Sequence, residues 1–95
     1  MNKQEAKILL EETRNNIDLI DKELIELIDK RTKLAKNVIE AKKSLNMDIF
    51  DPSREEKIHE KIRVLTADKN IETNDVIKII DILMNMNKDK QNEMS

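Results

Sequence analysis

The stretch that decides the fold runs from Lys7 to Leu45 and reads KILLEETRNNIDLIDKELIELIDKRTKLAKNVIEAKKSL. It contains neither Gly nor Pro, and apolar residues recur along it at alternating steps of four and three. This spacing is the heptad repeat of a helix that packs against another helix. A helix of this extent would be about 55–60 Å long. The rest of the chain is too short to cover it, so we expect a partner chain.

A second, shorter helix is expected beyond this stretch. Asn46 predicts the end of the long helix, because Asn tolerates the left-handed conformation that follows many helices. Asp51 and Pro52 then predict the N-cap and the first position of a helix over about residues 52–69.

A third helix is expected over about residues 74–91. Thr73 or Asn74 would cap it, and Asp75 in its first turn suits the helix dipole. The sequence therefore predicts an all-α protein with three helices, in which residues 1–95 form a single domain.

Composition narrows the function classes. The 18 Lys and Arg are interleaved with 20 Asp and Glu, giving a net charge of −2, whereas nucleic-acid binders carry a basic patch or stripe. With no Cys and one histidine, His59, thiolate and multi-histidine metal sites are excluded, and we expect no metal or cofactor. No apolar run approaches ~18 residues. We therefore expect a soluble, cytoplasmic protein that binds neither membranes nor nucleic acid.

Charged residues interrupt the apolar seam of the long helix. A single polar residue in such a seam often only sets register or meets solvent. Burying an unpaired cation, however, costs several kcal/mol. Three cations with one anion therefore indicate a bound anion, a buried partner or water, and the surplus favours an anionic ligand. The seam comprises Leu10, Arg14, Ile17, Asp21, Leu24, Ile28, Arg31, Ala35, Val38, Lys42 and Leu45.

The spacing of these cations predicts how they meet. Arg31 and Lys42 are about 16 Å apart along the helix, so two long side chains could share one small ligand. Arg14 lies about 25 Å before Arg31. It can join them only from an antiparallel partner helix, which suggests a two-fold homodimer with two symmetric pockets.

The two shorter helices add further candidates. Arg54 stands near a helix N-terminus, where a cation is unfavourable unless an anion binds beside it; an ordinary surface arginine is equally compatible. Glu55 follows it. Asn87 and Gln91 continue an apolar stripe, so their amides would point inward, although each alone is more typical of a fraying helix end. We expect solvated faces without a role at His59, Lys61, Arg63 and residues 88–90.

Four segments carry a resemblance to a known family: TRNNIDLIDKELIELIDKR (13–31), AKKS (41–44), IFDPSREE (49–56) and NKDKQ (87–91). Together they hold Arg-x2-Ile-x3-Asp-x9-Arg, a Lys eleven residues later, and Asp-x2-Arg-Glu. In one ungapped register over about residues 8–91, the chain resembles the all-helical chorismate mutases. The resemblance implies an intertwined three-helix homodimer that converts the dicarboxylate chorismate into prephenate.

The resemblance also implies catalytic roles. Lys42 and Gln91 would hydrogen-bond the ether oxygen of the substrate, and Glu55 would accept a hydrogen bond from the ring hydroxyl. The reaction is a pericyclic Claisen rearrangement, which needs no nucleophile. It is helped by holding the flexible dianion in its reactive shape and by stabilising charge on the ether oxygen.

The remaining roles concern substrate binding. Arg14 from the partner subunit and Arg31 would each bind a carboxylate, with Arg54 as a further cation beside the ligand. The backbone at Asp51 would assist at the ring hydroxyl. Asn87, where the family often has Ser, would donate to a carboxylate.

Two alternatives stay open. An isochorismate-pyruvate lyase uses the same scaffold, but its pattern looks apolar at the position of Glu55. A non-catalytic helical dimerisation or regulatory module would be expected to carry Leu or Ile at Arg31 and Lys42.

Overall fold

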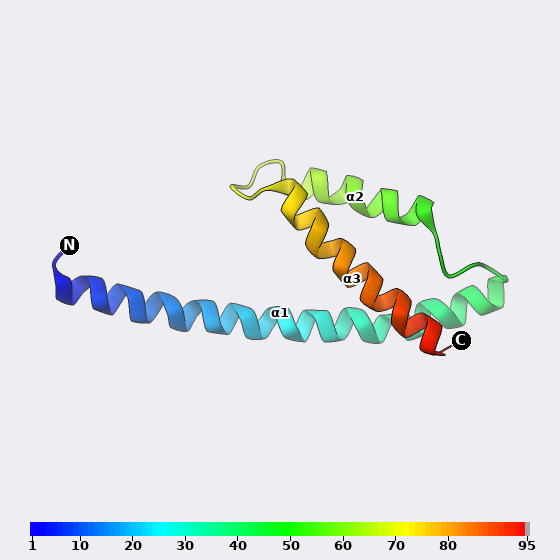
Figure 1. Ribbon diagram of the computed structural model, residues 1–95, viewed down its shortest axis with the longest axis horizontal. Coiled ribbons are helices and arrows are strands. Elements are labelled where there is room, and N and C mark those ends of the chain that lie inside the picture. Colours follow the sequence, from blue (N-terminus) through cyan, green and yellow to red (C-terminus); the bar gives the residue numbers. More distant parts are fainter. Residues whose placement is uncertain (95) are drawn as a thin grey trace. The chain divides into compact units, whose positions relative to one another are not determined.

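The computed structural model describes the backbone of residues 1–94 and the side chains of residues 1–88. It contains α1 (Lys3–Leu45), α2 (Pro52–Thr66) and α3 (Thr73–Met94), drawn in Figure 1, and no strand occurs in residues 1–94. The predicted all-α class with three helices is confirmed. The chain divides into two compact units, Met1–Lys30 and Arg31–Ser95.

The first unit is the N-terminal part of α1, which begins before the expected start at residue 7. Asn2 and Glu5 explain the earlier start. The side chain of Asn2 accepts a hydrogen bond from the Glu5 backbone N–H at 2.8 Å and donates to the Glu5 carboxylate at 2.6 Å. This arrangement resembles a capping box, which satisfies N–H groups that a helix start leaves unpaired.

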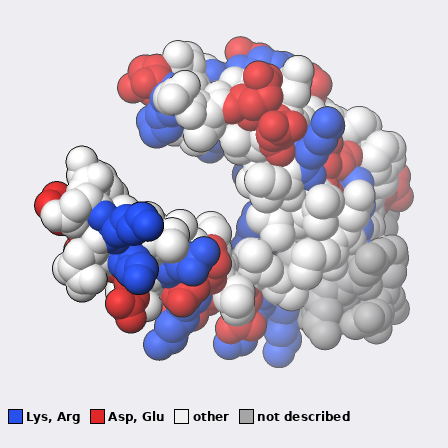
Figure 2. Space-filling model, turned by 60° about the vertical axis from the view of Figure 1, so that its left-hand side comes forward, with Lys and Arg blue, Asp and Glu red and all other residues white. Residues whose placement is uncertain are grey.

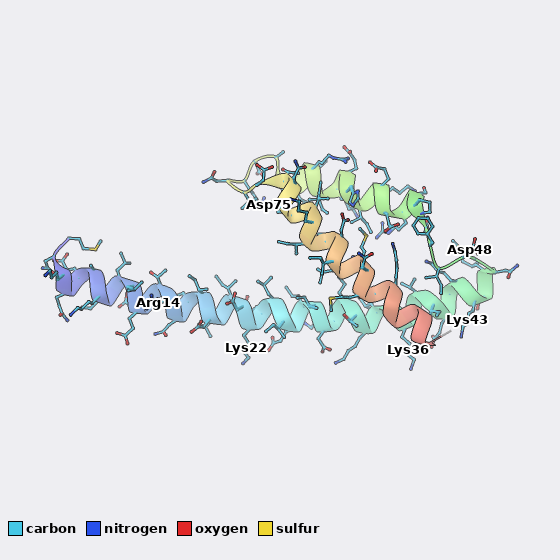
Figure 3. All side chains as sticks on the ribbon, in the orientation of Figure 1. Arg14, Lys22, Lys36, Lys43, Asp48 and Asp75 are labelled. Carbon is cyan, nitrogen blue, oxygen red and sulfur yellow. The ribbon has the colours of Figure 1, made fainter. Side chains whose placement is uncertain are left out.

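The apolar seam of the first unit is open to solvent in the single chain. Leu10, Ile17 and Leu24 have exposed fractions of 50%, 49% and 50%, and residues 1–30 include no buried side chain. Figure 3 shows side chains standing away from this part of α1 on both sides of the ribbon. A monomer rarely leaves so long an apolar stripe uncovered.

All three helices contribute buried apolar residues to the second unit. Ala35 and Ile39, one turn apart on α1, are buried together with Ile62 of α2 and Met84 of α3. α2 and α3 pack against each other. A hydrogen bond from Arg31 to the side-chain oxygen of Asn87 links the C-terminal part of α1 to α3.

A buried hydroxyl joins the end of α2 to the start of α3. Thr66 donates to the carbonyl of Ile62 at 2.8 Å, and its Oγ1 lies 2.8 Å from Oγ1 of Thr73. Thr66 is the one buried polar residue among the described side chains, and these two bonds satisfy its hydroxyl.

Local chemistry sets two helix ends as expected. Asn46 has a φ of 54°, in the left-handed region, and Met47 N–H donates to the Lys42 carbonyl at 2.9 Å. Asp51 caps α2 by accepting from the Arg54 backbone N–H at 3.0 Å, with Pro52 at the first position. Both predictions are confirmed.

The expected cap of α3 is wrong. Glu72, not Thr73 or Asn74, occupies the cap, because its carbonyl accepts from the N–H groups of Asp75 and Val76. The Glu72 carboxylate also accepts from the Asn74 N–H at 3.3 Å. Thr73 is instead engaged with the Thr66 hydroxyl, so its side chain serves the packing of α2 on α3.

Basic and acidic side chains intermix over the face shown in Figure 2, as the interleaved sequence predicts. None of the helices, over the residues described, combines the length and apolarity needed to cross a membrane.

Candidate active site

A cavity of about 300 Å³ lies within the second unit. It is bounded by the C-terminal part of α1, the connector after α1, the start of α2 and the last part of α3 that is described. One wall is apolar and is formed by Leu34, Ala35, Val38, Ile49, Ile58 and Met84.

The polar wall collects six of the residues that the sequence singled out. They are Arg31, Lys42, Asp51, Arg54, Glu55 and Asn87. A seventh polar residue, Lys88, was not predicted. Four cationic side chains thus face two carboxylates around one cavity, and the surplus of positive charge suits an anionic ligand.

Arg31 is a half-buried cation of this wall. Its guanidinium donates to the side-chain oxygen of Asn87, and the Asn87 amide N–H in turn lies 3.5 Å from the Thr32 hydroxyl. Burial lowers the pKa of the Arg31 guanidinium, and the charge of Arg54 lowers that pKa further. Arg31 nevertheless stays protonated, since a guanidinium group keeps its proton in proteins. An anion placed beside both guanidinium groups would relieve their repulsion.

Lys42 is oriented by the connector. It stands in the last turn of α1, where a cation suits the helix dipole. Its Nζ donates to the carbonyl of Ile49 at 2.5 Å. An ammonium group has three N–H donors, so this bond fixes the side chain and leaves donors for a ligand.

The start of α2 supplies the acidic side of the cavity. The side chain of Asp51 is occupied as the cap, and its carbonyl accepts from the Glu55 N–H at 3.1 Å. Glu55 is half-buried one turn later, while the side chain of Arg54 remains exposed at the rim. The helix cap therefore sets the positions of both cavity residues that follow it.

The prediction that Lys88 lies on a solvated face is wrong. Its Nζ lies 2.7 Å from Oε1 of Glu55 and 5.1 Å from the centroid of the Phe50 ring. The sequence held a signal, because Lys88 follows Met84 by four residues and so shares its helix face. The side chains of residues 89 and 90 lie outside the described part.

His59 was also misjudged as solvated. It is half-buried, and its Nε2 lies 2.6 Å from Oδ1 of Asp81, so the pair links α2 to α3. Lys61 and Arg63 are exposed as expected. His59 borders a second, acidic cavity of about 370 Å³ lined by Pro52, Glu55, Glu56, Asp81 and Asn85.

Two predicted site residues, Arg14 and Gln91, are not among the described side chains that line the cavity. Arg14 is exposed in the first unit (Figure 3), and its role in a partner subunit's site stays a prediction. The side chain of Gln91 lies outside the described residues. Among the side chains that are described, no group of three or more His, Asp or Glu could hold a metal ion.

The sequence matches the family described as chorismate mutase type II over residues 13–92. This match spans most of the chain and all of the cavity described above. The chain therefore belongs to the type II chorismate mutase family, and the resemblance seen in its motifs is confirmed.

Individual relatives agree with the family. A chorismate mutase of Methanocaldococcus jannaschii is 43% identical over 84 residues, which cover 88% of this chain and 85% of that protein. The bifunctional chorismate mutase/prephenate dehydratase of Aquifex aeolicus is 47% identical over 53 residues, 56% of this chain but 15% of the relative. The protein of the same name from Buchnera aphidicola is 34% identical over 71 residues, 75% of this chain and 18% of the relative. No solved structure matches the chain.

Proposed function

We propose that the protein converts chorismate into prephenate in the cavity of the second unit. The observation that carries the proposal is the surplus of cations around a cavity with one apolar wall, in a chain of the chorismate mutase family. Chorismate is a dicarboxylate, so its two negative charges match this surplus. The rearrangement needs no nucleophile, metal or cofactor.

The charges and the shape of the cavity together hold the substrate in its reactive conformation. Arg31 and Arg54 bind carboxylate oxygens from one side, and Asn87 keeps the Arg31 guanidinium in place. The apolar wall packs against the ring and excludes water. Holding a flexible molecule in one reactive conformer can supply several kcal/mol of the barrier, because its conformational entropy is already spent.

The ether oxygen of the substrate gains negative charge as its C–O bond stretches. Lys42 is the donor that meets this charge, since its ammonium is already oriented by the Ile49 carbonyl. Gln91 is the second proposed donor. Preoriented donors stabilise such charge better than water does, because they need no reorganisation during the reaction. Glu55 accepts from the ring hydroxyl.

The site is completed by a second copy of the chain. The seam of α1 that includes Leu10, Ile17 and Leu24 is about half exposed in the single chain, and an antiparallel copy would cover it. Arg14 of the partner then supplies the cation for the second carboxylate. Sedimentation equilibrium should therefore give the mass of a dimer; a folded, active species near 11.2 kDa would overturn the shared site.

The activity is tested by mixing purified protein with chorismate and following the loss of its ultraviolet absorbance. Loss of absorbance with formation of prephenate supports the proposal. Arg31→Ala should remove most of the activity, whereas Arg63→Ala, an exposed arginine outside the cavity, is the matched control. No turnover at micromolar protein would instead favour a non-catalytic helical module.

The nearest rival is an isochorismate-pyruvate lyase. It is distinguished by offering isochorismate and measuring pyruvate. Glu55 favours the mutase, because its carboxylate lines the cavity and a carboxylate can accept a hydrogen bond from the hydroxyl of chorismate. Faster turnover of isochorismate than of chorismate would reverse the assignment.

A further inference from the structure

Lys88 lines the cavity and forms an ion pair with Glu55, but the proposed mechanism gives Lys88 no role. The side chains of Lys88 and Glu55 are 27% and 23% exposed and their charged atoms lie 2.7 Å apart. By contrast, Lys78 and Asp75 on the outer face of α3 are 78% and 68% exposed and 4.0 Å apart. A pair shielded from water interacts more strongly than an exposed pair, whose net contribution to stability is small.

Lys88 is held from two directions. Its ammonium contacts the Glu55 carboxylate on α2 and stands 5.1 Å from the centroid of the Phe50 ring on the connector. A cation at this distance from an aromatic face is attracted to it. Lys88 therefore has a defined place between three segments of the fold.

Glu55 needs such a partner because it borders two cavities. Besides the cationic cavity, it lines the acidic one that includes Glu56, His59 and Asp81. Lys88 lines the cationic cavity and not the acidic one. Its charge therefore draws the Glu55 carboxylate toward the cationic cavity. It also offsets a negative charge that would otherwise repel a dianionic ligand there.

We propose that Lys88 is a positioning residue, whose ammonium holds the Glu55 carboxylate in the cationic cavity, where it accepts a hydrogen bond from the substrate hydroxyl. The proposal rests on the proposed function of Glu55. A carboxylate offers about four acceptor sites, so the bond to Lys88 leaves others for the substrate. Lys88 acts through Glu55 and makes no bond to the substrate.

A double-mutant cycle tests this role, because it isolates the coupling between two side chains. Lys88→Met keeps the length of the side chain and removes its charge; we expect kcat/KM to fall ~10–100-fold, mainly through a raised KM, since an unpaired carboxylate repels the dianion. Lys88→Arg should stay within ~5-fold of wild type, because the charge is kept. Lys78→Met, on the same helix but outside the cavity, is the control.

The decisive measurement is Lys88→Met in a Glu55→Gln background. A neutral amide neither needs the cation nor repels the substrate, so the second substitution should change kcat/KM less than ~3-fold there. An equal loss in both backgrounds would overturn the proposal, whether the loss came from direct substrate contact or from damage to the fold. Thermal unfolding of each variant separates those two causes.

The same measurements distinguish a failure of the proposed function from a failure of the role of Lys88. If wild type does not turn over chorismate, both the function and this role are overturned. If wild type is active but Glu55→Gln has no effect, the function stands and only the roles of Glu55 and Lys88 fail.

Discussion

Lys42 illustrates how a backbone contact at the edge of the cavity orients one of its side chains. Its ammonium donates a hydrogen bond to the carbonyl of Ile49. Ile49 belongs to the short connector between α1 and α2. This connector runs from Asn46, whose left-handed conformation follows the last residue of α1, to Asp51, which caps α2. The proposed donor is therefore already oriented in the absence of substrate, which is the condition under which a hydrogen bond stabilises a transition state.

Replacing Lys42 with Ala should lower kcat/KM by at least ~10²-fold, as the loss of one preoriented donor does elsewhere. The helix content should stay close to that of wild type, because the side chain is only half-buried. Initial rates measured by chorismate absorbance, with circular dichroism of the same samples, check both expectations. Lys61→Ala, at an exposed position of α2, is the control. Near-normal turnover in Lys42→Ala would remove Lys42 from the mechanism.

At the scale of the element, local chemistry predicted some helix ends and missed others. Asn46 and Asp51 were predictable because each acts on backbone groups next to it in sequence. The cap at Glu72 was missed because Thr73, a better cap by type, is engaged with Thr66 across the loop. That contact depends on how α2 packs on α3, and nothing in the sequence near Thr73 states it.

Likewise, the cavity residues that could be predicted are those with a local signal in the sequence, and the one that was missed depends on the tertiary fold. Arg31 and Lys42 stand out because a cation interrupts a long apolar seam, and the structure places both in one cavity. Lys88 escaped notice because it belongs to a charged run that looks solvated. Its partner, Glu55, lies 33 residues away in the sequence, so only the tertiary fold brings the pair together.

The Thr66 hydroxyl is expected to stabilise the junction of α2 and α3. Thr66→Val keeps the shape of the side chain but deprives the Thr73 hydroxyl of its partner, so the free energy of unfolding should fall by ~1–3 kcal/mol. Thr66→Ser keeps the hydroxyl and should lose less. Chemical denaturation at one fixed protein concentration measures both, since stability that includes association depends on concentration. A larger loss in Thr66→Ser than in Thr66→Val would show that the methyl group, not the hydroxyl, matters.

At the scale of the whole molecule, the question is which chain provides Arg14. It precedes Arg31 by 17 positions in the same helix, about 25 Å of ideal helix. Under the proposed dimer, each pocket combines Arg14 of one subunit with Arg31, Lys42 and Glu55 of the other. Neither chain alone then holds a complete site.

Subunit complementation checks this division. Arg14→Ala and Lys42→Ala homodimers should both be nearly inactive, because every pocket lacks one group. In a mixed dimer, one pocket carries both substitutions and the other carries none. Co-refolding equal amounts should restore activity to about a quarter of wild type, since random pairing makes half the dimers mixed and each has one intact site of two.

Mass spectrometry of the mixture provides the control, because it shows whether mixed dimers have formed. If they have formed and the mixture is still as inactive as its parents, Arg14 does not act across the interface. The pocket would then have to be built within one chain.

The uncovered seam of residues 1–30 also bears on the kinetics of assembly. Isolated helices are marginal in water, and most helical stability comes from packing. This part of α1 has no buried side chain in the single chain, so in the proposed dimer it gains its packing only on encounter with a second copy. The recovery of activity after dilution from denaturant should then be second order, with a half-time that lengthens about tenfold for each tenfold dilution, as subunit assembly steps do.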